Sequence, residues 1–237
     1  MKLFIDHLEK DPSFQKPKET SLHLCYHDEE KRNCLLIFPG GGYEHLAIKK
    51  EGTTISKWGQ TQEWHTAILT YQLDPFIPSH VVEEVADVMA QLRTDPKIDK
   101  IVAVGFSAGG HLAGLIGMIG EKKPDGLLLA YPVTFVNGSF AHEGSARQFY
   151  GDPLMKKDYS LNQLVTSNTP PCFIWHTVTD QAVPVENSLS LATALSKHNI
   201  SYELHLFPTG PHGLGMDDPT HPSYQWVHLA ETWLRQF

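Results

Sequence analysis

The chain has 237 residues, of which 41% are hydrophobic and 19% are charged, and its formal net charge is −8 at pH 7. This composition is typical of a soluble globular protein and excludes the disordered and fibrous classes. The acidic balance disfavours a nucleic-acid partner, because phosphate binding needs an excess of Lys and Arg on one face. The length predicts a single domain over residues 1–237.

The N-terminal residues MKLFIDHLEKDPSF lack the apolar core and small-residue cleavage site of a signal peptide. No apolar run reaches the length that spans a bilayer, so we expect no membrane partner. Cys25, Cys34 and Cys172 are odd in number and lie in apolar stretches, which is typical of buried free thiols. These features together predict a cytoplasmic protein.

Short apolar runs alternate with helical patterns along the chain. Continuous apolar runs predict buried strands, whereas apolar residues at helical spacing predict helices. In chain order, the predicted elements are strands 34–40 and 65–73, a helix within 78–96 that Ser79 caps, strand 100–106, helix 108–118, strands 125–133 and 171–180, helix 185–199, strand 201–208 and helix 224–237.

Strands that alternate with helices predict an α/β fold with a mostly parallel sheet and helices on both faces. Ligands of such sheets bind at the carboxyl ends of the strands. The segment Pro39–Tyr43 and the residues Ser107, Asp180 and His212 all follow predicted strands. We therefore expect them to lie together at one edge of the sheet.

Ser107 lies in the pattern G-x-S-x-G, formed by Gly105 to Gly109. The pattern alone is weak, but here a strand precedes it and a helix follows it, as in a nucleophile elbow. Small flanking residues let the strained turn approach its neighbours, and the helix N-terminus favours developing negative charge. This context predicts a nucleophilic serine rather than a structural glycine turn.

A serine nucleophile needs a general base, and 14 histidines are available. We favour His212, which lies in the Gly- and Pro-rich loop between the last predicted strand and the last helix. His111 is on the helix after Ser107 and is expected to pack the elbow. His176 and His205 lie within predicted strands.

The base needs an acid that fixes its orientation, and Asp180 ends a predicted strand between Ser107 and His212. The order Ser, acid, His is the chain order of α/β-hydrolase triads. Glu186 is better explained as a first-turn carboxylate of its helix. Asp217 lies too close to His212 in sequence to be the first choice.

A glycine-rich loop, Gly40 to Gly42, follows the first predicted strand and can bring backbone N–H groups to a substrate oxygen. The amide of Ala108, after the nucleophile, can supply another donor. Glycine loops also bind phosphates, but no G-x-G-x-x-G and no Gly-Lys-Ser/Thr accompanies this one. We therefore interpret the loop as part of an oxyanion hole.

The segments PGGGY, GFSAGGHLA, YPV, HTVTDQAVPVENS and FPTGPHGLGM together resemble the small bacterial α/β-hydrolases of the acetyl-esterase and feruloyl-esterase-like type. This group is close to the hormone-sensitive-lipase-like carboxylesterases, and the match runs from Leu35 to the last helix. The resemblance implies an α/β-hydrolase fold with little or no cap and the triad Ser107, His212 and Asp180. It implies oxyanion donors at Gly41, Gly42 and Ala108.

Pro39 stands where many members of this group have His, which brings the geometry of the glycine loop into question. The only room for a partial cover of the site is Ser139–Ser167. Its aromatic residues either line a substrate pocket or pack in the core; they are Phe140, Phe149, Tyr150 and Tyr159. We select Tyr43 and Phe149 as candidate substrate-binding residues.

The sequence predicts a serine carboxylesterase that hydrolyses small short-acyl esters through an acyl-enzyme, with no cofactor and no metal. An arylformamidase-like amidase and a peptidase of the prolyl-oligopeptidase type remain alternatives, as does a non-catalytic binding protein of this fold. The peptidases usually carry a propeller in front of the catalytic part.

The predicted partner is a small-molecule ester, and a homo-oligomer is compatible with the sequence. The last helix carries an apolar set that belongs either to the core or to a subunit interface: Trp226, Val227, Leu229, Trp233 and Leu234.

Overall fold

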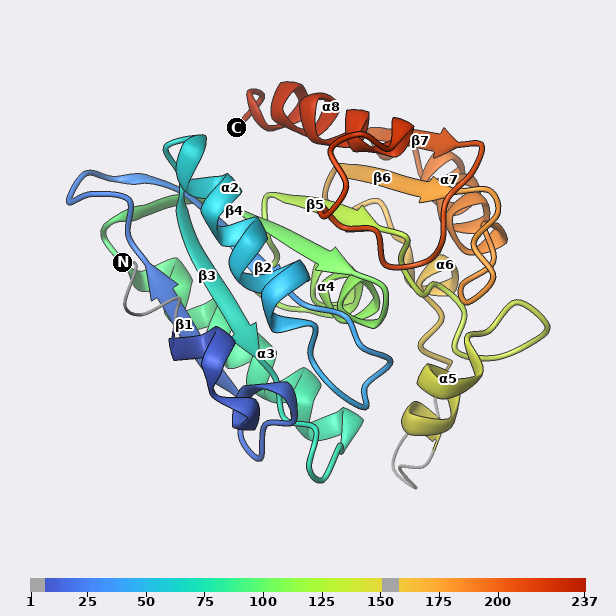
Figure 1. The fold of residues 1–237 in the computed structure, drawn as a ribbon, viewed down its shortest axis with the longest axis horizontal. Coiled ribbons are helices and arrows are strands. Elements are labelled where there is room, and N and C mark those ends of the chain that lie inside the picture. The colour runs from blue at the N-terminus through green and yellow to red at the C-terminus, as the bar shows by residue number, and fades with distance from the viewer. Residues whose placement is uncertain (1–6, 151–157) are drawn as a thin grey trace.

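A computed structural model describes residues 7–150 and 158–237, apart from the side chain of Tyr150. Within these residues, seven strands form one sheet in the order β1-β3-β2-β4-β5-β6-β7 (Figure 1). β1 is antiparallel to β3, and all the other neighbouring strands are parallel. The strands are β1 (Ser21–Cys25), β2 (Arg32–Phe38), β3 (His65–Thr70), β4 (Ile98–Phe106), β5 (Gly126–Ala130), β6 (Cys172–Thr177) and β7 (Tyr202–Phe207).

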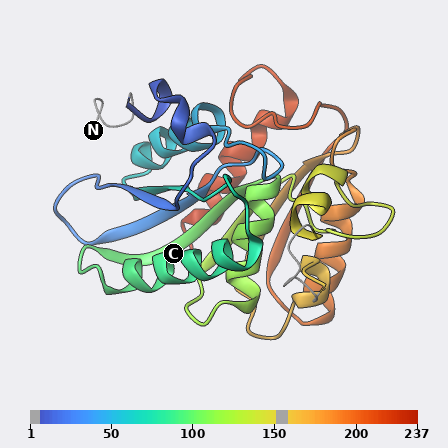
Figure 2. The same cartoon turned by 90° about the horizontal axis from the view of Figure 1, so that it is seen from below.

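Helices cover both faces of the sheet, as the sequence predicted. Figures 1 and 2 show α2 and α8 on one face and α3, α4 and α7 on the other. The helices are α2 (Thr54–Thr61), α3 (Pro78–Thr94), α4 (Ala108–Ile119), α5 (Glu143–Tyr150), α6 (Leu161–Leu164), α7 (Glu186–Lys197) and α8 (Gln225–Leu234). A π-helical turn, Ile48–Thr53, precedes α2, and short 3₁₀ turns cover Pro12–Gln15 and Pro222–Tyr224.

The predicted strands and helices are present, with shifts of a few residues at their ends. The start of α3 corrects one detail, because Ile77 is its N-cap and Pro78 its first residue, so Ser79 lies inside the helix. Proline suits this position because its missing N–H would have no partner in the first helical turn. Among the described residues, no helix is both long and apolar enough to cross a bilayer.

The apolar face of α8 belongs to the core, which decides between the two alternatives for this helix. The Trp226 ring stacks on that of Trp175 in β6, with the ring centroids 5.1 Å apart. Trp226 is fully buried, and Trp233 and Leu234 are nearly so. Leu229 is partly buried against the same core.

The carboxyl ends of the central strands are level with one another, and this alignment creates the site. Phe38 pairs with Gly105, Phe106 with Ala130, and Ala130 with Trp175. The loops that follow β2, β4, β5 and β6 therefore leave the sheet at one edge. α5 lies on the side of the sheet to which the arrowheads of β4 and β5 point (Figure 1).

Candidate active site

Ser107 occupies a sharp turn between β4 and α4. Its backbone has φ 53° and ψ −119°, a conformation that a non-glycine residue adopts only under strain. A Cβ at Gly105 would lie 2.5 Å from the carbonyl oxygen of Gly109, and one at Gly109 would lie 2.2 Å from that of Phe38. Both flanking positions therefore need glycine so that strand, turn and helix can approach each other.

The structure brings the three predicted triad residues into one hydrogen-bonded row. His212 Nε2 is 2.8 Å from Ser107 Oγ, and His212 Nδ1 is 2.6 Å from Asp180 Oδ2. A carboxylate only accepts, so Nδ1 carries the proton and Nε2 is left to accept from the serine hydroxyl. This arrangement can transfer the hydroxyl proton to the imidazole during nucleophilic attack.

Asp180 is held as a carboxylate by several donors. Its Oδ1 accepts from the backbone amides of Ala182 and Val183, each at 2.9 Å. Burial alone would raise the pKa of Asp180, but hydrogen bonds from His176 and His212 outweigh burial and hold it well below its usual range. Asp180 therefore stays ionised beside the imidazole.

His176 contributes to the site although the sequence analysis placed it simply within a strand. Its Nε2 lies 3.3 Å from Asp180 Oδ2 and 3.0 Å from the carbonyl oxygen of Val183. Its Nδ1 is 2.7 Å from Ser188 Oγ. The sequence analysis did not use the one local signal of this contact, which is the spacing of four residues between His176 and Asp180 at the end of a strand.

The glycine loop after β2 presents its backbone to Ser107. Gly41 and Gly42 have φ values of 132° and 67°, and both line the cleft that contains Ser107 and His212. A Cβ at Gly41 would lie 2.0 Å from the carbonyl oxygen of His45, so only glycine fits. Ala108 begins α4, where the first amide groups of a helix have no partner within it.

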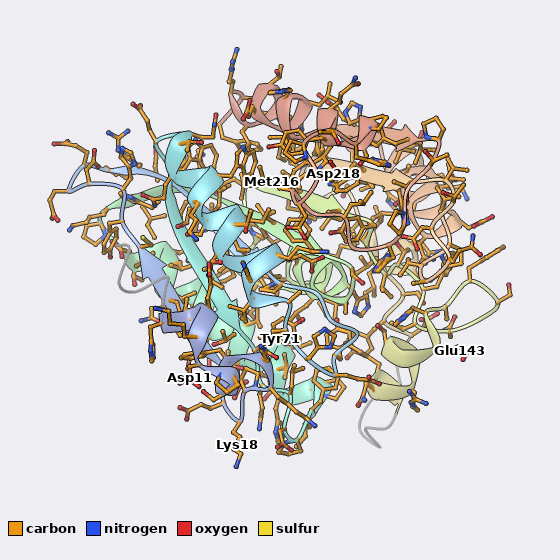
Figure 3. All side chains as sticks on the ribbon, viewed as in Figure 1. Asp11, Lys18, Tyr71, Glu143, Met216 and Asp218 are labelled. Carbon is orange, nitrogen blue, oxygen red and sulfur yellow. The ribbon has the colours of Figure 1, made fainter. Side chains whose placement is uncertain are left out.

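The geometry of this loop is fixed without a histidine at position 39. The Tyr71 hydroxyl donates to the carbonyl oxygen of Pro39 at 2.6 Å, and Figure 3 labels Tyr71 beyond the end of β3. The Gly40 amide donates to Glu51 Oε2 at 2.8 Å. These two bonds hold the segment that leads into Gly41 and Gly42.

The structure places Tyr43 and Phe149 in the core, whereas the sequence analysis expected them to contact substrate. They are 1% and 2% exposed, and their ring centroids lie 4.9 Å apart. The Tyr43 hydroxyl is 2.8 Å from Nδ1 of His111, as expected for a histidine that packs the elbow. Burial lowers the pKa of His111 to about 4, so its ring is neutral at pH 7. Tyr43 thus ties the glycine loop to α4.

A cleft with a volume of about 540 Å³ opens in front of Ser107. We call its side with Gly41, Gly42, Ser107 and His212 the catalytic wall, and its side with His142, Gly144 and Arg147 the α5 wall. The remaining lining residues are Glu44, His45, Ala47, Lys50, Glu51 and Gly213. The lining carries many hydrogen-bonding groups, which suits a polar molecule.

The α5 wall comes from the segment Ser139–Ser167 that was expected to offer partial cover. His142 Nδ1 accepts from the Ser145 amide at 3.2 Å, which leaves Nε2 as the proton-bearing nitrogen. Arg147 lies 3.4 Å from Glu44 across the cleft. Figure 3 shows Glu143, at the start of α5, on the outside of the molecule. Positions 151–157 and the side chain of Tyr150 lie outside the described residues.

The sheet, the strained serine turn and the Ser–His–Asp row define an α/β-hydrolase, which confirms the fold class predicted from the sequence. The chain belongs to the prolyl oligopeptidase family, whose model matches residues 59–237. This match covers the nucleophile elbow and the two loops that carry Asp180 and His212.

Individual relatives are described as hydrolases of acetyl esters or of xylan. The chain is 32% identical over 209 residues to an acetylxylan esterase from Xylanibacter ruminicola, an alignment that covers 81% of this chain and 43% of the relative. It is 33% identical over 214 residues to endo-1,4-beta-xylanase B from Butyrivibrio fibrisolvens, covering 80% of this chain and 33% of the relative. The chain therefore spans less than half the length of both curated relatives.

Among solved structures, the chain is similar to an acetyl ester-xyloside bifunctional hydrolase from Caldicellulosiruptor lactoaceticus. The sequence identity is 34% and the TM-score is 0.84, and the match covers 95% of this chain and 90% of that structure. This likeness therefore extends over nearly the whole of both chains.

Proposed function

We propose that the chain is a serine esterase that hydrolyses acetyl and other short-acyl esters of small alcohols. The observation that carries the proposal is the row Ser107–His212–Asp180 beside the amides of Gly41 and Gly42. The relatives described as acetyl ester hydrolases support the same reaction.

In the proposed mechanism, Ser107 Oγ attacks the ester carbonyl while His212 Nε2 takes its proton. The oxyanion accepts hydrogen bonds from the amides of Gly41, Gly42 and Ala108. His212 then protonates the departing alcohol, which leaves the acyl group on Ser107. Water attacks this acyl-enzyme with His212 again as base, and the acid is released.

The proposed substrate class is an acetylated carbohydrate. Polar side chains around the cleft, among them Glu44, His142 and Arg147, can hydrogen-bond to the hydroxyl groups of a sugar. The name of the relative from Xylanibacter ruminicola, acetylxylan esterase, supports this substrate class. An acetyl group is small enough for a serine that is itself only 6% exposed.

Hydrolysis of peptides is a second candidate, favoured by the description of the matching family. A peptidase uses the same triad order and differs in the leaving group, an amine that His212 must protonate. Hydrolysis of proline-containing peptide p-nitroanilides tests this candidate. Formamide hydrolysis tests the arylformamidase alternative.

The test of the proposal is hydrolysis of p-nitrophenyl esters from acetate to octanoate, with Ser107→Ala beside the wild type. Ser201→Ala is the matched control, because Ser201 is exposed and lies before β7. We expect rates that fall steeply beyond butyrate, no activity in Ser107→Ala and an unchanged control. Equal rates in Ser107→Ala, or faster peptide than ester hydrolysis, would overturn the proposal.

We also propose a cytoplasmic location. The three cysteines Cys25, Cys34 and Cys172 are buried free thiols, which supports a reducing compartment. Fractionation of the native host with an antibody to the chain tests this proposal, and recovery from the culture medium would contradict it.

A further inference from the structure

The floor of the cleft contains a buried carboxylate that the triad does not use. Glu51 is 3% exposed and lines the same cleft as Ser107 and His212. Its Oε2 accepts from the Gly40 amide at 2.8 Å, and its Oε1 accepts from the Tyr131 hydroxyl at 2.8 Å. A buried carboxylate is costly unless it is hydrogen-bonded, and Glu51 has a donor at each oxygen.

Tyr131 continues this contact to the loop of the catalytic histidine. Its hydroxyl oxygen accepts from the Gly215 amide at 3.0 Å, so its single proton is free to go to Glu51. Its ring meets the His212 ring edge-on, with centroids 5.0 Å apart. One chain of hydrogen bonds therefore joins Gly40, in the glycine loop, to Gly215, in the His212 loop.

The two hydrogen bonds to Glu51 act against the effect of its burial. Each carboxyl oxygen accepts one bond, and bonds of this kind favour the ionised form. Burial is the larger effect and raises the pKa of Glu51 above its usual range, and the bonds from Tyr131 and Gly40 offset only part of that rise. The carboxyl group is therefore a buried acceptor for two donors that come from different loops.

The π-helical turn that carries Glu51 makes another contact to the same loop. Lys50 Nζ donates to the carbonyl oxygen of Gly213 at 2.9 Å and lies 3.1 Å from Asp217 Oδ2. Consecutive residues of one turn thus hold the loop of His212, Lys50 at Gly213 and Asp217, and Glu51 through Tyr131 at Gly215. Turns of this kind are frequent at functional sites.

We propose that Glu51 is a positioning residue, which through Gly40 and Tyr131 sets the glycine loop and the His212 loop at the separation that ester hydrolysis needs. Gly40 immediately precedes the oxyanion donor Gly41, and Gly215 lies three residues after His212. Small displacements at either end move a donor or the base, and a shift of about 1 Å can cost roughly 100-fold in rate. The inference rests on the proposed function.

The test compares Glu51→Gln, Tyr131→Phe and the double variant with the wild type, using p-nitrophenyl acetate. Glu51→Gln keeps the shape and replaces one acceptor oxygen by a donor amide group, whereas Tyr131→Phe keeps the Glu51 carboxyl group and breaks the bonds to Glu51 and Gly215. We expect kcat to fall roughly 10- to 100-fold in each variant with KM within about twofold of the wild type, because the transition state depends most on placement. The double variant should lose little more than the more impaired single variant, because both changes break one network.

The affinity of a boronic acid that forms a tetrahedral adduct with Ser107 is a second measurement. A purely structural role of Glu51 would leave this affinity unchanged. We expect the affinity to fall by about the same factor as kcat, because the boronic acid occupies the oxyanion hole as the transition state does. The control is Ser56→Ala, which removes a buried hydrogen bond of 2.7 Å to Thr66, away from the cleft. We expect the control to lower the melting temperature and to leave kcat and boronic acid affinity unchanged.

The outcomes separate this inference from the proposed function. A folded Glu51→Gln with wild-type kcat, or losses that multiply fully in the double variant, would overturn the positioning role and leave the esterase intact. If Glu51→Gln does not fold, Tyr131→Phe decides, since an unchanged kcat there contradicts the network. A wild type without esterase activity would overturn both.

Discussion

The two walls of the cleft are built in different ways. On the catalytic wall, Ser107 is 6% exposed, and the Asp180 side chain behind it is fully buried and bonded to two backbone amides. On the α5 wall, Arg147 pairs with Glu44 at 3.4 Å, and these side chains are 75% and 53% exposed. The groups of the proposed reaction are thus held by the core, whereas the groups that we propose select the alcohol lie on an exposed surface.

The largest effect should come from the catalytic wall itself. Ser107→Ala removes the nucleophile, and we expect kcat/KM for p-nitrophenyl acetate to fall by about 10⁴- to 10⁶-fold. The melting temperature should stay at or above that of the wild type, because the strained turn loses no packing. A variant with a substantial residual rate would show that another group does the chemistry.

Asp180→Asn tests the support of His212 with nearly the same shape. The amide can donate to Nδ1 and so favour the wrong tautomer, and we expect kcat to fall by about 10³- to 10⁴-fold. KM should change little, because Asp180 does not line the cleft. Steady-state kinetics measure both constants, and a variant with more than a tenth of the wild-type kcat would contradict the assignment.

His111, which packs against the elbow, also makes the free energy of unfolding depend on pH. The unfolded chain takes up a proton at His111 near pH 6.5, whereas the folded protein does so only near pH 4, so stability falls as the pH drops through this interval. The difference corresponds to about 3 kcal/mol. His111→Gln, which can still donate and accept, should flatten the fall of the melting temperature between these pH values. If the melting temperature of His111→Gln fell with pH as steeply as that of the wild type, the claim that the His111 ring is buried and neutral would be contradicted.

The smallest effects should come from the α5 wall. Arg147→Ala breaks an exposed ion pair, and we expect its free energy of unfolding to change by less than about 0.5 kcal/mol. Loss of one hydrogen bond to a sugar hydroxyl should raise KM for an acetylated xylo-oligosaccharide by roughly two- to tenfold. Chemical denaturation and kinetics measure the two effects, and a large loss of stability would remove the contrast between the walls.

The sequence predicted most of the sheet and the triad for a physical reason. Buried strands such as β4 and β5 are continuous apolar runs, and a parallel sheet gathers whatever follows them at one edge. Ser107 and Asp180 follow such strands, and His212 follows the alternating edge strand β7, so their approach could be inferred without coordinates. β1 (Ser21–Cys25) was not predicted, because it is a short edge strand with mostly half-buried residues.

Apart from His111, the supporting residues were not predicted, because they depend on contacts between distant segments. Glu51 lies in a π-helical turn that has no periodic signature, and its partner Tyr131 is 80 residues away. Tyr43 was selected as a candidate substrate-binding residue, but its side chain is 1% exposed and packs in the core. Local pattern identified the reacting groups, whereas tertiary packing determines what holds them.

The central claim is that Ser107 becomes acylated during ester hydrolysis. The most direct measurement is mass spectrometry of the protein quenched during turnover of p-nitrophenyl acetate, followed by peptide mapping. The account predicts a single acetyl group on the peptide that contains Ser107 and none on Ser107→Ala. An acetyl group on another residue that turns over at the rate of hydrolysis would contradict it, as would steady hydrolysis by Ser107→Ala.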